Sequence, residues 1–321
     1  MTYYIFSMKR RITISAKTIF KLLKKSGVAF LDDKGLKLSA SLSYYTTLAL
    51  APLLILVISI VGFFFGKDAV RGHIFYEINN LIGSDAALQI QDILKNLELS
   101  GQTTTAILVS ILTLLVTSTT VFSEIQDSIN SIWKVKAKPK KGWLKIVKDR
   151  LLSSSLIIGI GFLMMISLLI NGLLVALNEY LKSIFPEITV ILFNGINLIM
   201  TFGILSLLFG VVFKVLPDAS IEWKDVRAGS FFTAGLFMLG RYLILLYIQT
   251  TGTGSAYGAA GSIIVLLVWL YYTSAILYFG AEFTKFFANL SGKRIRPSEY
   301  AVYVKSVEVE LDETEDTSIY K

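Results

Sequence analysis

Residues 39–66, SASLSYYTTLALAPLLILVISIVGFFFG, contain no charged side chain, and their polar side chains gather in the first part of the run. A helix of about 20 residues, rising about 1.5 Å per residue, crosses a bilayer hydrocarbon core of roughly 30 Å. The core helix of a soluble protein rarely needs so long an apolar run. The run therefore predicts a chain that folds within a membrane, with lipid as its solvent.

Five further apolar segments are long enough to span a bilayer. They lie at residues 103–122, 151–177, 188–213, 228–248 and 259–283. The composition agrees, because 54% of the residues are hydrophobic and only 17% are charged. We expect an all-α, polytopic membrane protein with six transmembrane helices.

The N-terminal segment, residues 15–26, predicts an amphipathic helix. Apolar residues recur at helical spacing (Ala16, Ile19, Phe20, Leu23), and lysines occupy the other face (Lys17, Lys21, Lys24, Lys25). Such a helix suits an anionic membrane surface, so membrane lipids are expected partners; a solvated docking helix is the alternative. In the first external connection, residues 69–81 and a stripe at Ile90, Ile93, Leu94 and Leu97 predict one or two short helices.

The distribution of Lys and Arg predicts the orientation of the chain. Of the 31 basic residues, 26 lie in the N-terminal segment, the 123–150 and 214–227 connections and the residues that follow the sixth predicted span. The alternate connections hold only Lys67, Arg71, Lys95 and Lys182. Because basic residues favour the cytoplasmic side, both termini should be cytoplasmic. We expect a cytoplasmic N-terminal segment at 1–38, a transmembrane domain at 39–290 and a flexible cytoplasmic tail at 291–321, in a bacterial inner membrane.

Polar side chains at membrane depth are costly and mark candidate sites. Arg241 lies about 12 Å inside the outer end of the fifth span by helical rise. Three asparagines fall at a similar depth: Asn171, Asn194 and Asn197. These residues predict a substrate-binding layer for an anionic group; the alternative is an arginine that reaches outward to lipid headgroups.

A second polar zone is expected towards the cytoplasm. Its members are Ser43, Tyr44, Thr47, Glu124, Asp127 and Glu282. Glu124 and Asp127 are three residues apart and share a helix face, where they could bind a cation or pair with the lysines of the following loop. The hydroxyl groups could instead bond to carbonyl groups of their own helices.

Several segments resemble the YihY/BrkB family of bacterial membrane proteins. They are SASLSYYTTLALAPLL at the first span, INSIWKV after the second, LPDASIEWKDVRAG before the fifth, and YGAAGSIIVLLVWLYYTSAILYFGAEF through the sixth. The resemblance covers nearly all of residues 30–288 and implies a six-span bundle in the bacterial cytoplasmic membrane. It implies no catalytic residues, although some family members have carried the label of a ribonuclease.

A ribonuclease activity is the least favoured hypothesis. Metal-assisted phosphodiester cleavage needs a cluster of His, Asp and Glu ligands, and the sequence shows no such cluster. The chain has no cysteine and one histidine, His73, on the expected outer face. No enzyme activity, metal, cofactor or nucleic-acid partner is expected. We expect a transporter or translocator of an anionic or amphiphilic, lipid-like substrate, alone, as a homo-oligomer or with protein partners. The alternative is a non-catalytic membrane scaffold in envelope assembly.

Overall fold

The computed structural model describes residues 16–82, 87, 88, 90–92, 95, 119–138, 159, 186–251, 261–290 and 294–305. Four long helices dominate this part of the chain: α2 (Gly35–Phe65), α7 (Pro186–Val215), α8 (Trp223–Thr251) and α10 (Gly261–Leu290). They coincide with the first, fourth, fifth and sixth predicted spans. With 29 to 31 residues each, they reach about 45 Å, more than a bilayer core requires.

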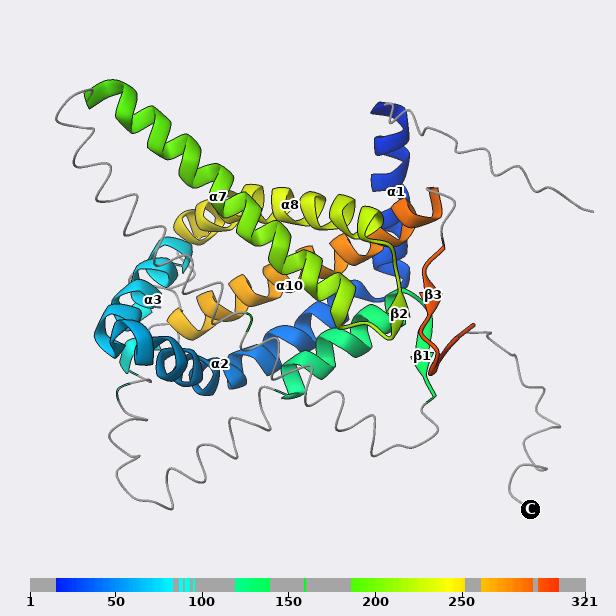
Figure 1. Cartoon of the computed structure of the whole chain (residues 1–321), viewed down its shortest axis with the longest axis horizontal. Helices are drawn as coiled ribbons and strands as arrows, with labels where there is room; N and C mark the ends of the chain where they lie inside the picture. Colours follow the sequence, from blue (N-terminus) through cyan, green and yellow to red (C-terminus); the bar gives the residue numbers. More distant parts are fainter. Residues whose placement is uncertain are drawn as a thin grey trace, which may run out of the picture.

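The long helices form a bundle in which α10 packs against both α2 and α8, and α7 packs against α8 (Figure 1). Within the described residues, two helices combine the length and apolarity needed to cross a membrane, at Gly195–Val215 and Ile263–Leu290. The predicted second and third spans, at 103–122 and 151–177, lie largely outside the described residues. The predominantly helical fold is thus confirmed, and the count of six spans stays a prediction.

Helix α1 (Ala16–Asp32) runs across the direction of α10 at one end of the bundle (Figure 1) and packs against α10 and α2. Leu22, Ser26 and Phe30 recur every four residues and are buried, so they form the face that contacts the bundle. Phe20 and Leu31 are 70% and 63% exposed. The face turned away from the bundle therefore mixes apolar side chains with the lysines.

At the other end of α2, Gly66 has a positive φ of 83°, a conformation that glycine adopts without strain, and α3 (Lys67–Ile82) begins. This helix confirms the first of the short helices predicted in that connection. His73 is buried in it. The stripe predicted at residues 90–97 falls mostly outside the described residues.

The short strands of the described residues gather at the end of the bundle that also carries α1, here called the strand end (Figure 1). β1 (Val135–Ala137) pairs antiparallel with β4 (Ala301–Tyr303), and β2 (Ala219–Ser220) pairs antiparallel with β3 (Arg296–Pro297). Two small sheets therefore accompany the helices of an all-α fold. Strands of two or three residues are too short to show a period in the sequence.

The same strands correct the boundary of the predicted tail. Residues 294–305 were expected to be flexible. However, β4 pairs with the connection that follows residue 132, and β3 pairs with the connection between α7 and α8. Ser298 N donates to Asp218 O at 3.0 Å, and Val304 N donates to Lys134 O at 2.9 Å. Each of these bonds pairs a backbone N–H group with a backbone carbonyl group, and both groups lie in connections, where helical hydrogen bonds are not available. Residues 294–305 therefore belong to the folded part of the chain.

Helices α8 and α10 approach closely through glycine. A side-chain carbon at Gly229 would collide with Thr284, and one at Gly280 would collide with Thr233. Each threonine hydroxyl donates at 2.7 Å to a carbonyl of its own helix, Thr233 to Gly229 and Thr284 to Gly280. Two G-x-x-x-T segments therefore pack reciprocally, a small-residue arrangement typical of membrane helices.

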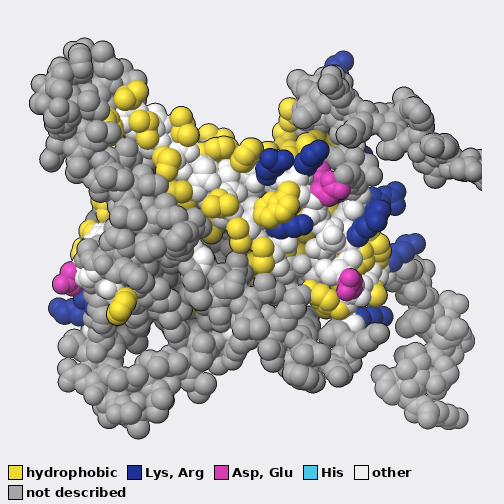
Figure 2. Space-filling view, in the orientation of Figure 1, with side chains coloured by type: hydrophobic (Ala, Val, Ile, Leu, Met, Phe, Trp, Pro, Cys, Tyr) yellow, Lys and Arg dark blue, Asp and Glu magenta, His cyan; other side chains and the backbone are white. Residues whose placement is uncertain are grey.

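Figure 2 shows hydrophobic side chains over the long helices and Lys and Arg gathered towards the strand end. The main hydrophobic core also reaches this end, where Ile129, Trp133, Phe213 and Tyr278 are buried in one cluster. The charged side chains described next lie beside this core.

Candidate functional site

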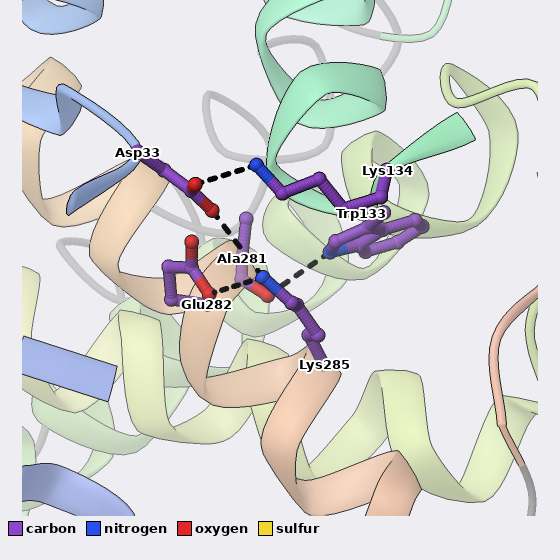
Figure 3. A network of polar contacts seen from close by, with 6 residues as sticks. All are labelled: Asp33, Trp133, Lys134, Ala281, Glu282 and Lys285. Atoms are coloured by element: carbon purple, nitrogen blue, oxygen red, sulfur yellow. Dashed lines mark hydrogen bonds and ion pairs between the residues drawn. The ribbon is translucent and has the colours of Figure 1, made fainter. Parts of the chain in front are cut away.

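The C-terminus of α1 positions the first charged residue of the site. Asp33 N donates to Ala29 O at 2.8 Å and Lys34 N donates to Leu31 O at 3.0 Å, which closes the last turn. Lys34 has a φ of 57°, the left-handed conformation that commonly ends a helix. The chain then turns into α2, and the Asp33 side chain is directed at α10 (Figure 3).

Residues 119–132 are helical and end in the same way. Trp133 N donates to Ile129 O, Lys134 N donates to Ser131 O, and Lys134 has a φ of 57°. This cap directs the Lys134 side chain back to Asp33, with 2.6 Å between Nζ and Oδ1. Two helix C-termini that are 101 residues apart in the chain thus meet through one ion pair.

Helix α10 supplies the other two charges. Lys285 Nζ lies 3.0 Å from Glu282 Oε2 and 3.4 Å from Asp33 Oδ2, so one ammonium group contacts both carboxyl groups (Figure 3). The Glu282 side chain is completely buried, and those of Asp33 and Lys285 are 13% and 19% exposed. We call Asp33, Lys134, Glu282 and Lys285 the charge cluster.

Burial raises the pKa of Asp33, but the adjacent Glu282 carboxyl group, the hydrogen bond from Lys134 and the charges of Lys285 and Lys134 outweigh that effect. The pKa of Asp33 therefore lies below its ordinary value of 3.8. Asp33 is the ionised centre of the cluster. Glu282 Oε1, in contrast, is buried and has no hydrogen-bond partner among the described residues.

Two neutral contacts hold the frame around the charge cluster. Trp133 Nε1 donates to the carbonyl oxygen of Ala281 at 3.0 Å, beside Glu282. Asn130 Nδ2 donates to Asp218 Oδ2 at 2.9 Å, and Asp218 N donates to Asn130 Oδ1 at 2.8 Å. The segment 130–134 is thereby fixed against α10 on one side and against the α7–α8 connection on the other.

A cavity of about 310 Å³ opens next to Lys134. It lies between the end of the 119–132 helix and the β1–β4 pair. Its lining residues are Asp127, Asn130, Ser131, Lys134, Val135, Lys136, Ala137 and Val304. Because the lining carries both signs of charge and backbone strands, the cavity suits a small polar ligand better than an apolar one.

The predicted cytoplasmic polar zone is brought together only in part. Glu282 belongs to the charge cluster, while Asp127 is exposed and lines the cavity. The Ser43 and Thr47 hydroxyls donate to carbonyl groups of their own helix, those of Ala40 and Ser43, as the alternative interpretation stated. Tyr44 is 58% exposed and Glu124 is partly buried.

The predicted substrate layer can be located only in part. Arg241 is partly buried on α8, and Asn197 is exposed on α7, where its Oδ1 accepts a hydrogen bond from Thr201 at 3.4 Å. The side chain of Asn194 and the whole of Asn171 lie outside the described residues. The association of Arg241 with the asparagines stays a prediction.

Asp33, Lys134 and Lys285 were not singled out from the sequence, and neither were Asn130 and Asp218. A signal for three of these was present. Asn130 and Lys134 belong to INSIWKV and Asp218 belongs to LPDASIEWKDVRAG, two of the segments that carry the family resemblance. No group of three or more His, Cys, Asp and Glu side chains suited to a metal ion occurs within the described residues.

Comparison with known proteins gives one family and a set of relatives. The family model described as "Virulence factor BrkB" matches residues 28–301. A UPF0761 membrane protein of Methylibium petroleiphilum is 24% identical over 94% of this chain and 72% of its own length. Others from Azotobacter vinelandii and Psychromonas ingrahamii are 27% and 28% identical, over 83% and 76% of this chain and 62% and 79% of their own lengths.

The chain spans less than two thirds of several of these relatives, including 62% of the Azotobacter protein and 60% of a relative from Verminephrobacter eiseniae. No solved structure matches the chain.

Proposed function

The chain belongs to the BrkB family and is an integral protein of a bacterial membrane, and from this premise we propose that it transports or translocates an anionic or amphiphilic, lipid-like substrate. In this proposal it spans the cytoplasmic membrane six times with both termini in the cytoplasm, and it has no enzyme activity. Relatives of this chain are named as membrane proteins, and those names indicate no substrate. The proposal therefore depends on the residues of this chain.

The observation that carries the proposal is the position of Arg241. It lies about 15 Å from the end of α8 at Thr251 by helical rise, well inside a predicted span. It is partly buried, and it forms no ion pair within the described part of the chain. An arginine at membrane depth is costly unless it is paired or faces a polar path, so it is by default a functional residue.

The surroundings of Arg241 favour an amphiphile over a small soluble anion. Leu239, Tyr242 and Leu243 on the same part of α8 are 59%, 67% and 58% exposed, so they are available to acyl chains. Gly240 lies against Tyr272 of α10, so Arg241 sits where a lipid-facing surface meets a helix contact. A negatively charged headgroup at the guanidinium and chains along the neighbouring surface would satisfy both environments. Asn171, Asn194 and Asn197 remain the proposed additional ligands.

A translocation assay tests the proposal. The full-length protein is reconstituted into vesicles that contain fluorescent phosphatidylglycerol or fluorescent phosphatidylcholine, and movement between leaflets is followed by chemical quenching of the outer leaflet. We expect faster movement of the anionic lipid than in protein-free vesicles, and a loss of about tenfold or more in Arg241→Leu, the value of one charge-assisted hydrogen bond.

Arg227→Leu is the matched control, because Arg227 is an exposed arginine of the same helix. Arg241→Lys should retain part of the activity, since it keeps the charge without the planar donor pair. Equal movement of both lipids with and without protein would contradict a lipid-like substrate. Equal rates for wild type and Arg241→Leu would remove Arg241 from the site.

A scaffold in envelope assembly is the second candidate, favoured by the exposed apolar side chains of α1. The structure sharpens its test, because residues 294–305 are part of the fold and must be kept. Deletion of residues 306–321 alone should abolish a recruiting function and spare lipid movement.

A further inference from the structure

The buried part of the charge cluster contains two carboxyl groups, those of Asp33 and Glu282, but only one ammonium group, that of Lys285. Glu282 is fully buried, and Asp33 and Lys285 are largely buried, whereas the Lys134 side chain is 44% exposed. Solvent therefore screens Lys134 more than the other three groups. Two carboxyl groups share one buried ammonium group, and like charges that share a buried site favour the uptake of a proton.

The two oxygens of Glu282 have unequal surroundings. Oε2 accepts a hydrogen bond from Lys285 at 3.0 Å, while Oε1 is buried without a partner within the described residues. In Figure 3 the Glu282 and Asp33 carboxyl groups are directed toward one another, with the Lys285 ammonium beside them. Two ionised carboxylates cannot bond to each other, because both are acceptors only. A proton on Glu282 Oε1 would supply the missing donor.

We propose that Glu282 and Asp33 form a proton-binding site in which Glu282 carries the proton and donates it in a hydrogen bond to the Asp33 carboxylate. The proton comes from water through Asp33, the more exposed of the two carboxyl groups. Its binding makes the buried group of Asp33, Glu282 and Lys285 neutral. Resting on the proposed transport function, this proton is also the coupling ion.

The charged groups that face the pair come from three elements. Lys285 of α10 faces both carboxyl groups, and Lys134, which follows the 119–132 helix, faces Asp33 at the end of α1. Loss of the proton would place two negative charges between α1 and α10, so protonation tightens the strand end and deprotonation loosens it.

Infrared spectroscopy of the full-length protein in lipid nanodiscs tests proton binding directly. At about pH 6.5, where exposed carboxyl groups are ionised, we expect a carboxylic-acid carbonyl band in the wild type that is lost in Glu282→Gln. Asp68→Asn is the matched control, because the Asp68 side chain is fully exposed on α3, and it should keep the band. Asp33→Asn provides a second route if Glu282→Gln does not fold: with one carboxylate opposite Lys285, the band should also be lost.

A band that is absent from the wild type, or unchanged in the folded variants, would overturn the proton site. The vesicle assay then separates coupling from transport. An imposed pH gradient should change the rate of lipid movement about tenfold in the wild type and leave Glu282→Gln insensitive. A band without any lipid movement would keep the proton site and reject the proposed function, while pH-insensitive movement with a band would reject coupling alone.

Discussion

The indole Nε1 of Trp133 donates a hydrogen bond of 3.0 Å to the carbonyl oxygen of Ala281, 148 residues further along the chain. The bond attaches the connection after residue 132 to α10, one residue before the buried Glu282. Trp133 is itself only 4% exposed, so the contact lies in the core of the strand end. The two lysines and two carboxyl groups of the charge cluster are held together by this frame.

Replacement of Trp133 by Phe should remove this hydrogen bond, because Phe has no side-chain N–H donor, while an aromatic ring still occupies the position. We expect a loss of about 1 kcal/mol in the free energy of unfolding, the usual net value of one hydrogen bond. Denaturant-induced unfolding in mild detergent measures it. Trp223→Phe serves as the control, because Trp223 is 54% exposed at the start of α8; an equal loss in both variants would count against the bond.

The reciprocal glycine–threonine contact makes Gly280 sensitive to a single methyl group. Gly280→Ala places a carbon against Thr233, whose hydroxyl is fixed to Gly229 O, so α8 and α10 must separate. Overpacking of this kind costs about 1–3 kcal/mol. Gly235→Ala on α8 has open space around it and should leave stability unchanged or slightly raised. Thermal unfolding of the two variants side by side decides whether the contact is as close as described.

The Asn130–Asp218 pair should be strongly coupled. Asn130→Leu removes two hydrogen bonds and leaves a carboxyl group that is only 2% exposed with fewer partners, at a cost of about 1–3 kcal/mol. In a double-mutant cycle with Asp218→Leu, the second substitution should cost much less once the first is present. Additive losses would show that the two side chains act separately.

Stability should fall in acid through Asp33. Burial raises the pKa of Asp33, but the adjacent Glu282 carboxyl group, the hydrogen bond from Lys134 and the nearby lysine charges lower it by more than burial raises it. Its folded-state pKa is thus below the ordinary value of 3.8, so its contribution is complete above that value and is lost as the pH falls from there through the folded-state pKa. Unfolding measured from about pH 6 down to about pH 2 should show a shallower decline in Asp33→Asn than in the wild type.

The orientation can be mapped with single cysteines, because the chain has none of its own. Asp68→Cys on α3 should react with a membrane-impermeant maleimide in intact cells, while Glu299→Cys at the strand end should react only after the membrane is opened. Both positions are exposed in the structure, so lack of labelling reports the membrane and not burial. Labelling of Glu299→Cys in intact cells would reverse the predicted topology.

Long apolar runs in the sequence predicted the positions of the long helices well. The spans expected at 39–66 and 188–213 match α2 and α7 within a few residues, because about 20 apolar residues suit a bilayer whatever their neighbours are. Glu282 was singled out for the same kind of reason: a carboxyl group near an apolar span is unusual in any fold. The serines and threonines of α2 were less informative, since their hydroxyls bond locally and need no distant partner.

The sequence by itself determined that the chain is a mostly helical, apolar protein with its basic residues in alternate connections, since these properties depend on local composition and period. Only the tertiary structure decided that Asp33, Lys134, Glu282 and Lys285 meet, and that residues 294–305 complete two small sheets. Ion pairs between different helices leave no periodic pattern in the sequence. Asp33, for example, lies 252 residues from Lys285. Such contacts are chosen by how the helix ends pack together, so they become visible only in the folded chain.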